Sequence, residues 1–174
     1  GLRLLGLRLL GLRLRLLGLR RWLLGLRLGL GLGLADHGRQ RQRHLRLGGN
    51  LGHGDTQDQL RPKRVEALAH VRVVSVAAGN GFSMALTIHG DVYSWGSGRQ
   101  GRLGLGNTEN QSLPQPVVAL DKEDVVGIAA GSSHALAVTA AGAVWAWGWG
   151  SNGQLGLGGN TQDQHLPQRV VGLE

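Results

Sequence analysis

The sequence predicts an all-β fold, an incomplete β-propeller of four-stranded antiparallel blades, and three observations support it. The stretch 74–103 returns at 126–155, with every matched position 52 residues later. Short runs rich in β-branched residues alternate with Gly, Asn and Asp inside each copy. Each copy holds four such runs, which is the strand content of one propeller blade.

Several residues recur at this period and are expected to have structural roles in each unit. They are Gly79 and Gly131, Gly90 and Gly142, and Trp95 and Trp147; His134 has Phe82 as its counterpart. A third, partial copy precedes them, because residues 51–54 stand 52 positions before 103–106. The chain therefore contains two near-complete units and the back half of another.

The first unit is expected to contain strands at 71–78, 82–87, 92–95 and 116–120. The turn at 88–91 and its equivalent need a positive φ, which Gly90 and Gly142 can adopt without strain. Small residues at 77–79 and 129–131 suit a strand end where blades crowd toward a shared axis. Trp95 and Trp147 are expected to fill the gap between adjacent blades.

The leading segment, residues 1–46, differs in composition from the rest of the chain. It is a low-complexity Leu, Arg and Gly tract with eleven Arg against Asp36 alone. We expect it to be either disordered or an artefact of the gene model; membrane-surface or nucleic-acid binding is the alternative. Arginine recurs too often for a membrane span.

The repeat region, residues 47–174, has eight basic and ten acidic residues, so its net charge is 8 − 10 = −2. Direct nucleic-acid binding is therefore expected only through the basic segment. The chain has no cysteine, which excludes disulfides and thiolate metal sites. Cytoplasmic or nuclear residence fits this composition.

The motifs that suggest chemistry are better explained as structural features. Residues 96–101 and 148–153 both match G-x-G-x-x-G, but no helical period follows, so we interpret them as loops and expect no cofactor. His53, Asp55 and His134 lack the ligand spacing of a zinc site. The run 132–134 resembles a nucleophile beside a base, yet its counterpart 80–82 lacks both groups. We expect neither a metal nor an enzyme.

Several sequence words occur in a fixed order: AAGSSHALAVT, then VYSWG or VWAWG, then SNGQLGLG or RQGRLGLG, then LPQPVVAL. Over about residues 47–174 these words resemble the repeat of the regulator-of-chromosome-condensation family. The resemblance implies a seven-bladed propeller that serves as an interaction platform. The family includes the exchange factor for the GTPase Ran, plant ultraviolet photoreceptors and HECT-type ubiquitin ligases. The photoreceptor words Gly-Trp-Arg-His-Thr are absent, which disfavours that branch.

We therefore expect a protein-interaction scaffold whose partner is a protein, either a small GTPase or a chromatin protein. The alternatives are guanine-nucleotide exchange on a Ran-like GTPase and a targeting propeller of a HECT-type ligase. Candidate contact residues lie in equivalent loops that diverge between the units: Arg99, Gln100, Arg102, Trp149, Ser151 and Gln154. So few blades would expose sheet edges and apolar faces, so the chain is expected to be marginally stable or to self-associate.

Overall fold

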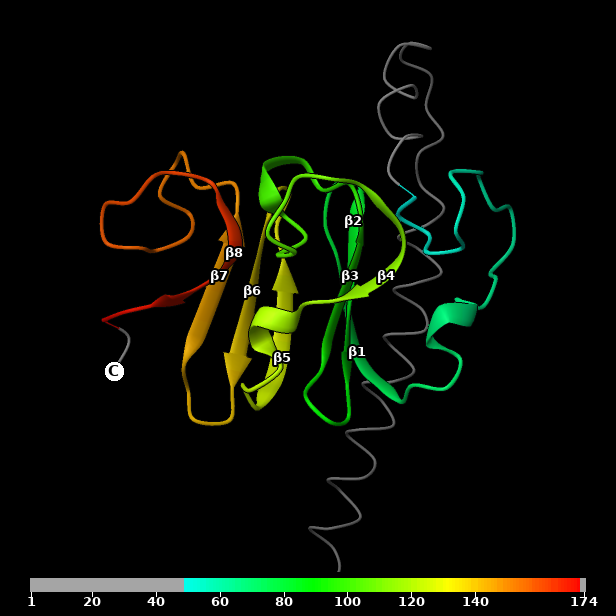
Figure 1. Ribbon diagram of the computed structural model, residues 1–174, viewed down its shortest axis with the longest axis horizontal. Helices are drawn as coiled ribbons and strands as arrows, with labels where there is room; N and C mark the ends of the chain where they lie inside the picture. The colour runs from blue at the N-terminus through cyan, green and yellow to red at the C-terminus, as the bar shows by residue number, and fades with distance from the viewer. Residues whose placement is uncertain (1–48, 173–174) are drawn as a thin grey trace, which may run out of the picture. The chain divides into compact units, whose positions relative to one another are not determined.

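The computed structural model describes residues 49–172, which form two four-stranded antiparallel sheets, here called blade 1 and blade 2 (Figure 1). The predicted leading segment, residues 1–46, lies outside the described residues. Within each blade the strands lie side by side in chain order. Blade 1 contains β1 (Val73–Ala78), β2 (Phe82–Thr87), β3 (Val92–Gly96) and β4 (Gln111–Pro116). Blade 2 contains β5 (Val125–Ala130), β6 (His134–Thr139), β7 (Val144–Gly148) and β8 (Gln164–Val170).

The two blades share their register as well as their strand order. Phe82 pairs with Gly96 across β2 and β3, and His134 pairs with Gly148 across β6 and β7. The pairing of the first two strands also shifts at the same place in each blade, between Val73 and Ser75 in β1 and between Val125 and Gly127 in β5. The repeat in the sequence is therefore a repeat of three-dimensional structure, and the predicted fold class is confirmed.

The strand boundaries agree with the sequence prediction within one residue, except at the first and fourth strands. The first strand begins two residues late, at Val73. The fourth prediction, 116–120, is wrong because β4 ends at Pro116 and the apolar run after it forms the short 3-10 helix η3 (Val118–Leu120). The run is apolar because two of its side chains, Val117 and Leu120, belong to the hydrophobic core, where each is 1% exposed. Pro114 lies inside β4, where a sheet edge tolerates a residue without an N–H.

Both hairpin turns between the second and third strands contain a glycine in the left-handed region. Gly90 has φ +88° and Gly142 has φ +84°. In blade 1 the Thr87 hydroxyl donates to the Asp91 carboxylate at 2.9 Å, and the Thr87 N–H donates to the Asp91 carbonyl at 2.9 Å. The glycine and these bonds together close the turn at the lower end of the blade in Figure 1.

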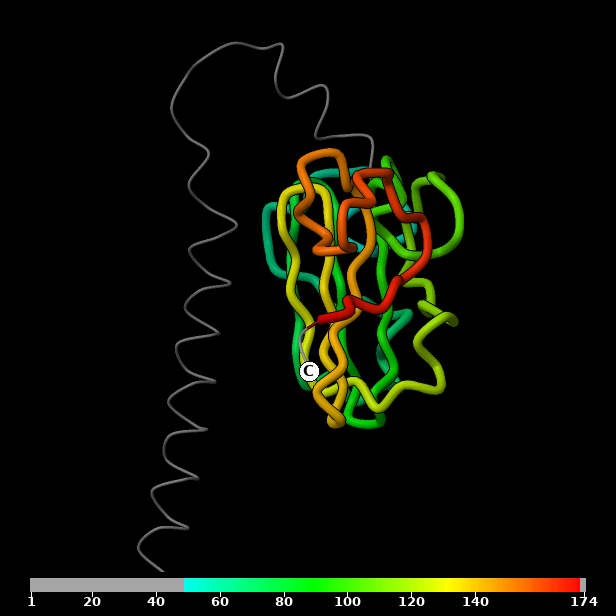
Figure 2. Tube along the Cα trace, turned by 90° about the vertical axis from the view of Figure 1, so that its left-hand side faces the viewer, coloured from blue at the N-terminus to red at the C-terminus, as the bar shows by residue number. Residues whose placement is uncertain are grey.

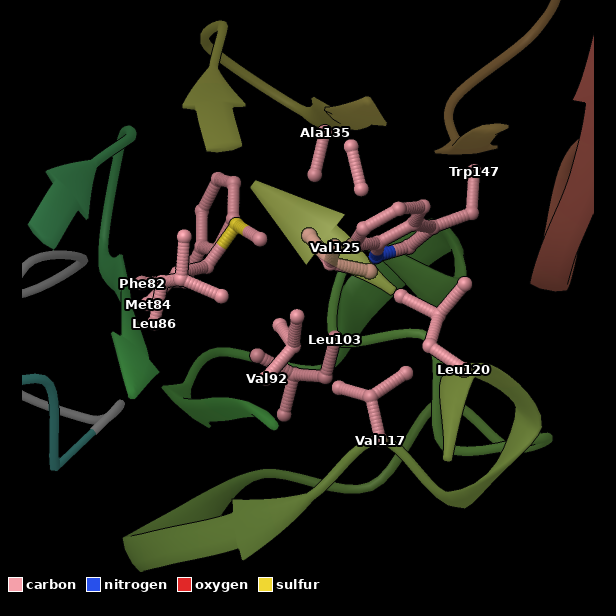
Figure 3. Close-up of a cluster of buried hydrophobic side chains, with 11 residues drawn as sticks. Phe82, Met84, Leu86, Val92, Leu103, Val117, Leu120, Val125, Ala135 and Trp147 are labelled. Carbon is pink, nitrogen blue, oxygen red and sulfur yellow. The ribbon is translucent and has the colours of Figure 1, made fainter. Parts of the chain in front are cut away.

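The hydrophobic core lies between the blades rather than inside either sheet (Figure 3). Strand β5 packs against β1 and β2, and Figure 2 shows the strands of blade 2 in front of those of blade 1. Blade 1 contributes Phe82, Met84, Leu86, Val92, Leu103, Val117 and Leu120; blade 2 contributes Val125, Ala135, Ala137 and Trp147. A single sheet cannot cover its own apolar face, so each blade depends on its neighbour.

The opposite face of blade 2 carries the same positions in a more exposed state. Phe82 of β2 is 1% exposed, whereas its equivalent His134 in β6 is half-buried. Leu86 is 2% exposed, whereas its equivalent Val138 is 36% exposed. The difference follows from position, because β5 covers β2 while no strand within residues 49–172 covers this face of β6.

We predict that Phe82→Ala lowers the free energy of unfolding by about 3–5 kcal/mol, because it leaves a cavity between the blades. His134→Ala is the matched control, since it truncates the equivalent position on the open face, and should cost about 1 kcal/mol. Urea unfolding followed by tryptophan fluorescence measures both. Equal losses for the two variants would show that the core does not lie between the blades.

Candidate functional site

Trp147 joins blade 2 to the long loop of blade 1, residues 97–110, between β3 and β4. It is 0% exposed, and its indole N–H donates to the carbonyl oxygen of Arg102 at 3.1 Å. The ring lies on Gly104, where an added Cβ would be 2.8 Å from the indole nitrogen. Gly104 also has φ +72°, which an L side chain rarely adopts. The junction therefore needs a tryptophan on one blade and a glycine on the other.

Trp95 is held in the same way by the segment that precedes blade 1. Its indole N–H donates to the carbonyl oxygen of Asn50 at 3.0 Å, and an added Cβ on Gly52 would be 2.8 Å from the indole nitrogen. The Ser83 hydroxyl donates to the same carbonyl at 3.0 Å. We call a three-residue segment of this kind an indole cradle: its first carbonyl accepts the indole N–H and its third residue is the glycine beneath the ring.

The turn between the first and second strands of blade 1 lies close to the equivalent turn of blade 2, which explains the small residues in both turns. A Cβ on Gly79 would overlap the Phe82 ring and would be 2.6 Å from the carbonyl oxygen of Gly131. The Asn80 N–H donates to the carbonyl oxygen of Ser132 at 3.1 Å, which links these two turns directly. Gly79 is therefore required at the contact between neighbouring blades.

Arg102 has a different position from the one expected of a contact residue. It is 7% exposed, and its guanidinium donates to the carbonyl oxygens of Asn80 (2.9 Å) and Arg99 (2.8 Å) and to the side-chain oxygen of Gln100 (2.8 Å). Burial lowers the pKa of Arg102, the nearby charge of Arg99 lowers it further, and Asp163 opposes the shift. Arg102 links the loop between β3 and β4 to the turn that contains Asn80, and little of its own side chain is accessible to a partner.

Gln100 is also partly used inside the molecule. It has φ +61° and is the one non-glycine residue with positive φ within 49–172. Its side-chain oxygen accepts from Arg102, so its side chain is directed inward. It belongs to the 3-10 helix η2 (Arg99–Gly101), which packs against β7 and β8 of blade 2. Of this loop's three candidates, Arg99 alone is exposed.

The equivalent loop of blade 2 places its candidates nearer to solvent. The Trp149 backbone N–H donates to the carbonyl oxygen of Ser133 at 2.9 Å, and the side chain is half-buried. Ser151 is exposed, and the half-buried Gln154 accepts from the Asn152 N–H at 2.8 Å through its side chain. The structure thus leaves Arg99, Trp149 and Ser151 as the more accessible members of the set, and their contact role stays a prediction.

Two residues that close these loops were not anticipated from the sequence. The Gly98 N–H donates to the Asn110 side chain at 3.0 Å, and the Gly150 N–H donates to the Asp163 side chain at 3.0 Å. The two acceptors are 53 residues apart rather than 52, because the second loop is one residue longer. The two side chains are therefore equivalent once the insertion is allowed for, but the sequence does not show which backbone N–H groups bond to them.

The part of the chain that the structure describes contains no group of three His, Asp or Glu side chains able to hold a metal ion. Among residues 49–172, no helix has the length and apolar content needed to cross a membrane. The geometry offers a pair of packed blades with anchored loops at one end. These features define a repeat protein of the β-propeller class.

The model of the regulator of chromosome condensation (RCC1) repeat matches residues 48–86, 89–138 and 141–174. The chain therefore belongs to the RCC1 repeat family. A second RCC1 repeat model matches residues 73–102 and 125–154.

Individual relatives have similar repeats but are much longer. The chain is 42% identical over 123 residues to the ultraviolet-B receptor UVR8 of Arabidopsis thaliana, which covers 71% of this chain and 28% of the receptor. It is 45% identical over 114 residues to the human E3 ubiquitin-protein ligase HERC2, which covers 64% of this chain and 2% of the ligase. A crystal structure of yeast RCC1 (Prp20) bound to Kap60 matches with 25% identity and TM-score 0.59 over 72% of this chain and 31% of that one. The chain spans less than a third of each.

We predict that Gly104→Ala destabilises the blade junction more than Gly106→Ala does. Both glycines have positive φ, so each alanine should cost about 1–2 kcal/mol of backbone strain. Alanine at Gly104 also presses on the Trp147 indole, which should add about 1–3 kcal/mol of overpacking. At Gly106 the added Cβ would be 3.5 Å from Leu166, an ordinary contact. Denaturant unfolding measures both losses, and equal losses would remove the cradle from the account.

Proposed function

We propose that this chain is a protein-interaction module in which the blade pair presents the loops 97–110 and 149–163 to a protein partner. The loops are anchored at both ends, through the bonds of Gly98 to Asn110 and of Gly150 to Asp163. Loops held on a rigid scaffold are where binding function concentrates. Preorganised loops also lose less conformational entropy when they bind.

The observation that carries this proposal is Trp149. Its backbone N–H is bonded to Ser133, yet the residue is only half-buried. The equivalent position in blade 1 is Ser97, so the tryptophan is not needed to build a blade. Tryptophan is enriched among the residues that dominate binding energy at interfaces. Arg99 and Ser151 supply polar contacts on the same type of loop.

A protein partner agrees with the crystal structure in which Kap60 is bound to yeast RCC1 (Prp20), a protein of this family. Guanine-nucleotide exchange on a Ran-like GTPase and a targeting role beside a HECT domain are the finer alternatives. Both belong to proteins much longer than this chain, so they remain proposals. A cytoplasmic or nuclear location is proposed with them.

We predict that Trp149→Ala weakens binding of the protein partner by about 2 kcal/mol, roughly thirtyfold in Kd. The partner is first captured from extract by the full chain, identified by mass spectrometry, purified, and titrated by calorimetry. Val118→Ala is the control, because Val118 is 66% exposed but follows β4 at the opposite end of the blade.

Unchanged affinity in Trp149→Ala, or equal loss in both variants, would remove the loops as the binding surface. The finer alternatives are tested in parallel with a fluorescent-GDP release assay on a Ran-like GTPase. Faster release with the full chain than without it would favour the exchange alternative over a plain scaffold.

A further inference from the structure

Blade 2 carries a third indole cradle with no indole in it among the described residues. The segment Gln154–Gly156 is the equivalent of Arg102–Gly104, one period later. The two glycines have the same conformation, since Gly156 has φ +68° and Gly104 has φ +72°, and each donates its N–H to the carbonyl oxygen three residues earlier. A Cβ on Gly104 would meet Trp147, whereas a Cβ on Gly156 would meet only Val170, at 3.4 Å. The cradle is therefore formed before any tryptophan occupies it.

The neighbouring face of β6 is open in the same direction. On β2 the residues Phe82, Met84 and Leu86 are at most 2% exposed because β5 covers them. Their equivalents on β6 are His134 and Leu136, both half-buried, and Val138, which is 36% exposed. Blade 1 contacts blade 2 through the cradle Arg102–Gly104 and through β2. The cradle Gln154–Gly156 and this face of β6 are the equivalent surface on blade 2.

We propose that this surface binds blade 1 of a second copy of the chain, with Trp95 of that copy on the cradle Gln154–Gly156. The junction inside the chain shows what the surface accepts: a first strand like β5 and a tryptophan like Trp147. Blade 1 offers the same elements, because β1 reads VVSVAA where β5 reads VVGIAA, and Trp95 is the equivalent of Trp147. The contact continues an interface that the chain already makes.

Such pairing is head-to-tail, so it leaves one free surface at each end and can continue to further copies. It also has an internal competitor. In its own chain Trp95 already lies on the cradle Asn50–Gly52, with the indole bonded to Asn50 at 3.0 Å. A second copy must displace that segment, and association is therefore weak and concentration-dependent.

The first test is sedimentation velocity on the full 174-residue chain at rising concentration, with wild type, Gly156→Val and Gly158→Val. Both glycines have positive φ, +68° and +63°, so valine strains both backbones alike. Gly156→Val fills the cradle, whereas a Cβ on Gly158 has no described atom within 4 Å. Wild type and Gly158→Val should associate, and Gly156→Val should remain monomeric.

The second test frees Trp95 from its own chain. A Cβ on Gly52 would be 2.8 Å from the Trp95 indole nitrogen, so Gly52→Val should push its segment off the ring and shift association to lower concentration. Gly54→Val is the control, with positive φ but only an ordinary 3.5 Å contact to Leu113. Circular dichroism confirms that each variant is folded.

Three results would overturn the proposal: a wild-type chain that stays monomeric throughout, association of Gly156→Val equal to that of Gly158→Val, or no difference between Gly52→Val and Gly54→Val. Gly52 and Gly54 lie outside the loops 97–110 and 149–163, whereas Gly156 and Gly158 lie in the loop that carries Trp149. Binding of the protein partner is tested with Trp149→Ala, which leaves the cradle Gln154–Gly156 intact, and self-association is tested without the partner, so either proposal can fail alone.

Discussion

The packing of an indole on a glycine of the preceding repeat is the contact on which the rest of the structure depends. A four-stranded sheet has two faces, and neither β2 nor β6 can bury its apolar side chains without a neighbouring sheet. Trp147 fixes the distance and angle of that neighbour, because its ring needs Gly104 beneath it and its N–H needs the Arg102 carbonyl. The core from Phe82 to Trp147 is buried only while this contact holds.

The same constraint separates structure from function in the long loops. In blade 1 the middle of the loop is used for the junction: the Arg102 guanidinium bonds to Asn80, Arg99 and Gln100, and Leu103 is 1% exposed in the core. Residues outside this segment are free to differ between repeats, as Trp149 and its counterpart Ser97 do. Divergence at positions that the junction does not use is what lets a common blade present different surfaces.

Much of the fold could be predicted from the sequence because the packing repeats with the chain. The period of 52 residues and the Gly90 and Trp95 positions predicted blades, hairpins and interblade tryptophans. The fourth strand was missed because Val117 and Leu120 look like strand residues but are buried in and beside η3. The candidate site was less predictable, since the sequence shows that Arg102 differs from Gln154 but not that its guanidinium turns inward. Asn110 and Asp163 were not predicted as loop anchors, because the sequence does not show which backbone N–H group bonds to each side chain.

The most direct test of the central claim is hydrogen exchange of the indole N–H groups, followed by NMR on the ¹⁵N-labelled chain with signals assigned through single Trp→Phe variants. We predict slow exchange for Trp95 and Trp147, whose N–H groups are bonded to Asn50 and Arg102, and fast exchange for Trp149. If the Trp147 indole exchanges as fast as that of Trp149, the blades are not locked by the cradle.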